Sequence, residues 1–140
     1  MLNETKPYYF IYYDHLTINR MSKDASNEFD LKQLTRVDIS EEKNEKEFII
    51  TEKEKIKSLR KIISRIEWER DIKPQMAEKE DMIATLFFTY DKNMPERLTE
   101  YSIWFSEKDG SAAIFHREKN ELGTLDKKNG QALRVLLNNN

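Results

Sequence analysis

The clearest hydrophobic pattern in the sequence predicts an amphipathic helix that begins at Glu52. Apolar residues recur there at spacings of three and four, which place them on one face of a helix. They are Ile56, Leu59, Ile62, Ile63 and Ile66. Thr51 can cap the first turn, and Glu54 stands at the second position of a capping box. We expect a short strand at residues 48–50 before this helix, and we expect the helix to end near Trp68.

Alternating and aromatic-rich segments in the second half of the chain predict antiparallel strands. Residues 82–90 and 98–105 are separated by a break that contains Pro95, so we expect the two strands to pair. Asp109-Gly110 supplies a turn that tolerates a positive φ, and residues 112–117 follow as a third strand. Together these segments predict a β-meander.

The C-terminal pattern predicts a short fourth strand at residues 122–125 and then a helix that Asp126 caps. Gly130 weakens the first turn of this helix. The apolar face that we expect it to bury consists of Ala132, Leu133, Leu136 and Leu137. The element order indicates an α+β fold, in which an antiparallel β-meander carries the amphipathic helix and the C-terminal helix on one face.

The N-terminal third is aromatic at first and polar afterwards. Residues 8–13 predict a strand, and its residues cannot all be buried on a one-sided sheet, so tyrosines should be exposed there. Exposed tyrosines favour protein interfaces. The candidate interface residues are therefore Tyr8, Tyr9, Phe10, Tyr12 and Tyr13. A strand covered on both faces is the alternative. Residues 22–47 predict a long polar connection with short ordered pieces.

Composition limits the classes of protein and partner. The 140 residues suit a single domain, with residues 1–47 as an N-terminal part and 48–138 as the strand, helix, meander and helix core. A net charge of -2 from interspersed charges disfavours polyanion binding, so no nucleic-acid partner is expected. The absence of cysteine excludes disulfides, thiolate nucleophiles and sulfur-based metal sites. No transmembrane segment or signal peptide is evident, so we expect a soluble chain that is either cytoplasmic or an extracytoplasmic ectodomain without its signal segment.

No motif carries recognisable chemistry. The two histidines, His15 and His116, match no metal or catalytic spacing, and His116 alternates with Phe115, which predicts an imidazole that faces solvent. The isolated glycines form no phosphate-binding loop, so neither a cofactor nor a metal is expected. Acidic runs such as residues 78–81 are typical of solvated linkers, and the serines lack the turn of a nucleophile elbow.

The layout between residues 45 and 138 resembles a known group of proteins. It combines the segments 48–51, 101–105 and 122–125 with a helix that ends in Trp68 and a leucine-rich terminal helix. This arrangement is similar to small, largely uncharacterised lipoprotein-type domains of spore-forming Gram-positive bacteria. The resemblance implies the same element order and possible tethering to a membrane, but the chain has no lipid-accepting cysteine. It implies no functional residues.

Three hypotheses for function follow. The first is a non-enzymatic protein-interaction module that binds a protein partner or self-associates through the N-terminal aromatic strand. The second is a small hydrolase or ligand-binding enzyme whose carboxylates converge only in the fold, which a cleft with buried acids would support. The third is a binder of a membrane surface or nucleic acid through the basic helix at residues 52–70, although acidic residues dilute its field.

Overall fold

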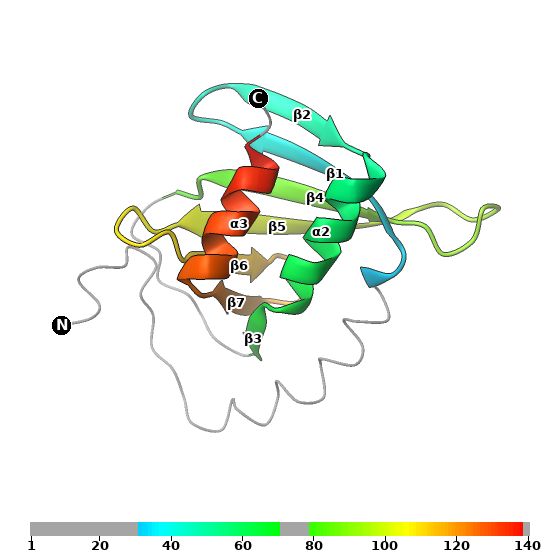
Figure 1. The fold of residues 1–140 in the computed structure, drawn as a ribbon. Helices are drawn as coiled ribbons and strands as arrows, with labels where there is room; N and C mark the ends of the chain where they lie inside the picture. Colours follow the sequence, from blue (N-terminus) through cyan, green and yellow to red (C-terminus); the bar gives the residue numbers. More distant parts are fainter. Residues whose placement is uncertain (1–30, 71–78, 139–140) are drawn as a thin grey trace.

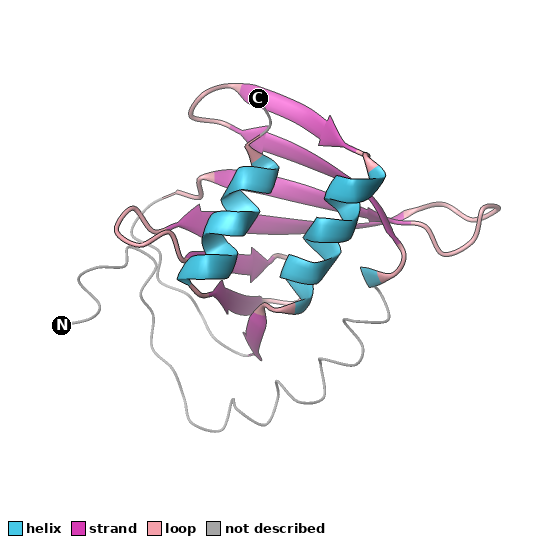
Figure 2. Ribbon diagram, viewed as in Figure 1, coloured by secondary structure: helices cyan, strands magenta, loops and turns pink. Residues whose placement is uncertain are grey.

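One antiparallel sheet dominates the computed structural model, which describes residues 31–70 and 79–138. Its seven strands lie in the order β2-β1-β4-β5-β6-β7-β3 (Figure 1). The strands are β1 (Leu34–Glu41), β2 (Lys46–Ile50), β3 (Glu67–Arg70), β4 (Met82–Phe88), β5 (Arg97–Phe105), β6 (Ala112–His116) and β7 (Glu121–Leu125). Two helices, α2 (Lys53–Ser64) and α3 (Lys127–Leu137), cover the same face of this sheet, as Figure 2 shows. The predicted α+β fold class is confirmed.

The hydrophobic core lies between the sheet and the two helices. Alternate residues of β4 are buried against the helices, while the residues between them are half-buried on the opposite face, because successive side chains of a strand point to opposite sides. Helix α2 contributes the apolar stripe predicted from the sequence, with Ile56, Leu59, Ile62 and Ile63 buried. Helix α3 buries Leu133 and Leu137. None of the described helices is long and apolar enough to cross a membrane.

The predicted meander is confirmed, and its pairing is continuous from β4 through β7. Each of these strands pairs antiparallel with the next one along the chain. The turn between β5 and β6 contains Gly110 with a φ of 84°, as the sequence predicted. Asp126 caps α3, because its side chain accepts a hydrogen bond of 2.8 Å from the backbone N–H of Asn129. Ala132 was predicted to be buried but is exposed.

The prediction of a polar connection at residues 22–47 is wrong where the structure describes it. Strand β1 lies inside that range and pairs with both β2 and β4, so it is an interior strand of the sheet. The register shifts between Leu34 and Arg36. This irregularity breaks the alternation of apolar and polar residues, which explains why the sequence pattern does not reveal a strand. The candidate interface at residues 8–13 lies outside the described residues.

The expected start and end of the first helix also need correction. Its N-cap is Glu52, no side chain caps it, and the capping box predicted from Thr51 and Glu54 does not form. The helix ends at Ser64, and Trp68 belongs to β3, which pairs with β7 at the far edge of the sheet. Ile66 continues the helical spacing although it follows the helix, so periodicity alone overestimates the length of α2.

Helix α3 packs against the β5–β6 turn at a point where a side chain would not fit. A Cβ atom at Gly130 would overlap the carbonyl oxygen of Gly110 and would lie 2.9 Å from the Cα of Ser111. Both obstacles are backbone atoms, which cannot move aside without displacing the turn. The glycine that weakens the isolated helix is therefore required by the packed one.

We predict that Gly130→Ala lowers the free energy of unfolding by about 1–3 kcal/mol, because the added methyl group forces the helix away from the turn. In an unobstructed helix the same substitution would be stabilising by about 1 kcal/mol. Urea unfolding followed by circular dichroism measures the change. Ala132→Gly, at an exposed position of the same helix, serves as the control and should cost about 1 kcal/mol through helix propensity alone. A Gly130→Ala variant more stable than the parent protein would contradict the close packing.

A second prediction compares the two helix starts. Asp126→Ala removes a side-chain cap and should lower the free energy of unfolding by about 1 kcal/mol. Glu52→Ala should change it by only a few tenths, because Glu52 makes no side-chain cap bond. Both values come from urea unfolding under the same conditions. Equal losses in the two variants would show that the cap assignment is incorrect.

Candidate functional site

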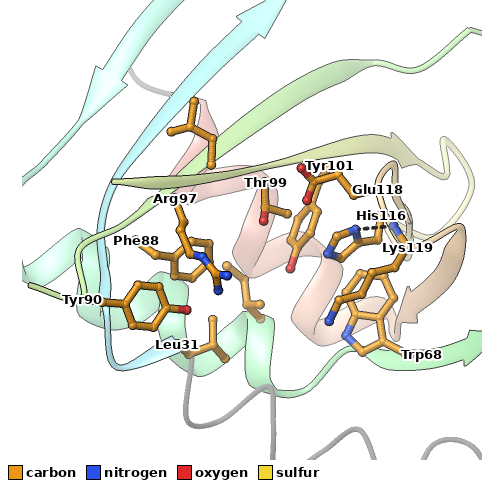
Figure 3. A pocket seen from close by; sticks show the side chains of 12 residues that line it. Leu31, Trp68, Phe88, Tyr90, Arg97, Thr99, Tyr101, His116, Glu118 and Lys119 are labelled. Carbon is orange, nitrogen blue, oxygen red and sulfur yellow. Dashed lines mark hydrogen bonds between the residues drawn. The ribbon is translucent and has the colours of Figure 1, made fainter. Parts of the chain in front are cut away.

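A cavity of about 400 Å³ opens at the C-terminal end of α2, on the helix-covered side of the sheet. Its apolar walls come from Leu31, Ile63 and Phe88. Most of its polar groups come from β5, from the end of β6 and from the turn that follows, as Figure 3 shows. The cavity therefore brings together residues from segments that are distant in the sequence.

Three rings form a buried cluster at one end of this cavity. Trp68 comes from β3, Tyr101 from β5 and His116 from β6. The ring centroids are 5.6 Å apart for Trp68 and Tyr101, 6.0 Å for Trp68 and His116, and 5.4 Å for Tyr101 and His116. All three contacts are tilted or edge-to-face, which is the arrangement that aromatic rings prefer. The imidazole is thus held from two sides.

The structure overturns the prediction that His116 faces solvent, since this residue is 7% exposed. The strand register places it opposite Tyr101 on one side and Glu121 on the other, and it projects toward the helices. Ile114 and Ala112, two and four residues earlier, have the same parity and are fully buried. Parity groups His116 with these two residues, but Ala113 of the opposite parity is fully buried as well, so parity by itself could not show which face is the interior.

A backbone hydrogen bond selects the form of the imidazole. The N–H of Lys119 donates to Nδ1 of His116 over 3.2 Å, and the turn is closed by the N–H of Asn120, which donates to the His116 carbonyl oxygen over 2.9 Å. Asn120 has a φ of 56°, a conformation that asparagine tolerates better than most residues. A neutral imidazole carries one proton, so with Nδ1 accepting, the proton is on Nε2. His116 is therefore a hydrogen-bond donor through Nε2.

Glu121 adds a carboxylate to the same layer. Glu121 is 6% exposed, and no other acidic residue that the structure describes is buried. Its Cα is paired directly with that of His116, so the two side chains project on the same face with Cβ atoms about 5 Å apart.

The other end of the cavity is cationic. Arg97 begins β5, and its guanidinium carbon lies 5.5 Å from the centre of the Tyr90 ring. In Figure 3 the Arg97 side chain reaches into the cavity beside Tyr90. Lys119 and Glu118 line the cavity from the β6–β7 turn, at the His116 end, where the Lys119 N–H donates to His116. Of these lining residues, Glu118 supplies the one carboxylate.

Carboxylates do gather elsewhere, but they are not buried. A cavity at the β1–β2 turn is lined by six of them: Glu41, Glu42, Glu45, Glu47, Glu80 and Asp81. Asp81 accepts a hydrogen bond of 2.7 Å from the Phe105 N–H, and a hydrogen bond to Glu42 raises the pKa of Lys79. The described residues include no group of three or more acidic or histidine side chains that could hold a metal ion. This cavity therefore lacks the buried acid pair that the hydrolase hypothesis expected.

The structure describes only some of the surfaces that the sequence predicted. The tyrosine interface lies outside residues 31–70 and 79–138 and stays a prediction, and so does the basic helix as a binding surface. Two cations of that helix are used within the fold. Arg60 donates to the carbonyl oxygen of Leu34 over 2.7 Å, and Arg65 donates to Oδ1 of Asn129 over 2.8 Å.

These features define a small α+β protein whose antiparallel sheet carries two helices and a cavity with a buried histidine. The sequence matches no known protein family and no curated protein. A solved structure, that of a thioesterase-like protein from Clostridium sporogenes, does share the fold. The two sequences are 19% identical, and the structures superpose with a TM-score of 0.55. The match covers 76% of this chain and 96% of the Clostridium sporogenes chain.

This likeness corrects the prediction that the chain is not an enzyme, because the protein that shares its fold is thioesterase-like. It does not bear on the resemblance to lipoprotein-type domains, which stays a prediction. At 19% identity it establishes the fold alone, so catalytic residues must be argued from the cavity.

We predict that His116 is protonated at Nε2 and not at Nδ1 at neutral pH, because Nδ1 accepts the Lys119 N–H. Long-range proton–nitrogen NMR spectra of the imidazole rings distinguish the two tautomers. The His15→Gln variant assigns the signals, since the chain has two histidines. A proton found on Nδ1 would contradict the geometry of the turn.

Proposed function

We propose that the chain is a small hydrolase that cleaves an ester or thioester, with the cavity around His116 as its active site. The observation that carries this proposal is the buried imidazole in the cavity wall, held by two aromatic rings and fixed as an Nε2 donor. Its support is the fold shared with a thioesterase-like protein. A fixed donor in the wall of a cavity suits a reaction in which a carbonyl oxygen gains negative charge.

The imidazole acts as the electrophile in this reaction. The substrate carbonyl oxygen accepts a hydrogen bond from Nε2–H of His116, and this bond strengthens as the oxygen becomes an oxyanion. The Tyr101 hydroxyl points into the cavity in Figure 3 and can donate to the same oxygen. Because these groups are positioned by the strand register, they need no rearrangement during the reaction.

Glu118 is the proposed general base. A water molecule attacks the carbonyl carbon while its proton passes to the Glu118 carboxylate, which lines the cavity. The tetrahedral intermediate then collapses, the bond from carbon to sulfur or oxygen breaks, and the leaving group takes the proton from Glu118. The products are a carboxylic acid and a thiol or alcohol. No covalent intermediate with cysteine can form, because the sequence has no cysteine.

We expect the purified chain to hydrolyse p-nitrophenyl esters or acyl thioesters, and His116→Phe to lower kcat about 100-fold to 1000-fold. Phenylalanine preserves a planar ring but offers no donor. His116→Gln, which offers an amide N–H near the position of Nε2, should restore part of the loss. Glu118→Gln should lower kcat about 100-fold or more, because the base is removed.

Glu107→Gln, at an exposed position in the β5–β6 turn, is the control and should keep the parent activity. Circular dichroism and the urea midpoint verify that each variant is folded. The proposal fails if the parent chain cleaves none of these substrates, or if the folded His116→Phe variant cleaves them at the parent rate.

A further inference from the structure

The two ends of the cavity differ in chemistry, and the difference indicates what kind of molecule fits. One end holds the His116 donor, and the other holds the guanidinium of Arg97 beside Tyr90. We propose that the substrate carries an anionic group at the end remote from its reacting carbonyl, and that Arg97 binds this group. This inference rests on the proposed function and names the substrate class of the same site.

No group of the described protein neutralises Arg97. The Arg97 side chain makes no ion pair or side-chain hydrogen bond with any residue that the structure describes. Its sequence neighbour Glu96 precedes β5 and instead accepts a hydrogen bond of 3.1 Å from Thr89. Among the described residues, none therefore competes with a ligand for the charge of Arg97.

The guanidinium is also oriented for this task. The ring of Tyr90 holds it by a cation–π contact, which limits its freedom without using its N–H donors. Five donors in a planar fork match the two oxygens of a carboxylate or a phosphate. An anion bound there stands at the mouth of the cavity, where its charge stays partly hydrated.

The strand spacing defines the distance between the two ends. Arg97, Thr99 and Tyr101 point to the same face of β5, because alternate residues of a strand do so. Four residues of an extended strand separate the Cα atoms of Arg97 and Tyr101 by about 13 Å. An elongated molecule can lie along β5 with its carbonyl at His116, its apolar middle against Phe88 and its anion at Arg97.

The anion can belong to either product of the hydrolysis. It is a terminal carboxylate if the acyl group lies along β5, or a carboxylate or phosphate on the thiol or alcohol if the leaving group lies there. Both arrangements use the same contact with Arg97, and pairs of substrates that differ in one charge distinguish them.

The first pair is p-nitrophenyl hydrogen adipate and its methyl ester, which place a charged or a neutral group at the end of the acyl chain. The second pair is the butanoyl thioester of mercaptopropionate and that of its methyl ester, which place the same difference on the leaving group. In one of the two pairs we expect kcat/KM to be about tenfold to 100-fold higher for the anion. The pair that shows the preference identifies the product that carries the anion.

Arg97→Gln should abolish this preference, so that kcat/KM for the anionic substrate falls about tenfold to 100-fold relative to that for the neutral substrate of the same pair. Arg97→Lys should keep a smaller preference, because the charge remains but the fork is lost. Arg134→Gln is the matched control, since Arg134 also lies over an aromatic ring, that of Phe105, but does not line the cavity. It should retain the full preference.

Equal kcat/KM values within both pairs, or a preference that persists in Arg97→Gln, would overturn the inference while the proposed function stands. If the parent chain cleaves none of the four substrates, the proposed function fails, and calorimetry decides the inference separately. Tighter binding of monomethyl adipate than of dimethyl adipate, lost in Arg97→Gln, would support it. Equal binding of the two, or binding of neither, would overturn it.

Discussion

The arrangement of the cavity depends on the close contact between β3 and β7 at Gly123. A Cβ atom there would overlap the Ile66 side chain and would lie 2.9 Å from the Trp68 ring. Because Gly123 has no side chain, the segment after α2 can lie flat against β7, and Trp68 reaches Tyr101 and His116. The absence of a side chain at Gly123 thus allows the three rings to meet at the end of the cavity.

The second constraint is the register of the meander. Direct pairing of Tyr101 with His116, and of His116 with Glu121, puts three polar groups in one row on the helix-covered face. Such burial costs free energy unless the polar atoms are hydrogen-bonded, and the Lys119 N–H meets part of that requirement at Nδ1 of His116. Burial and the hydrogen bond at Nδ1 together hold the His116 ring in place with its proton on Nε2.

A polar row in a core is the kind of local conflict that is expected at functional sites rather than in a purely structural core. The remainder of the same face is apolar, from Ile39 and Leu86 to Ile103 and Ile114. The cavity lies where this apolar face ends, beyond the last turn of α2 and next to Arg97. The apolar part of this face stabilises the fold, and the proposed active site lies at its edge.

The sequence by itself determined the elements whose signals are local: the stripe of α2, the cap at Asp126, the turn at Gly110 and the order of the meander. It did not reveal β1, because the register shift near Arg36 interrupts the alternation, nor the end of α2, because Ile66 continues the helical spacing. Only the tertiary structure decided which face of β6 is covered, and therefore that His116 is buried. The physical reason is that strand parity shows which residues share a face, whereas long-range pairing and helix packing decide which face becomes the interior.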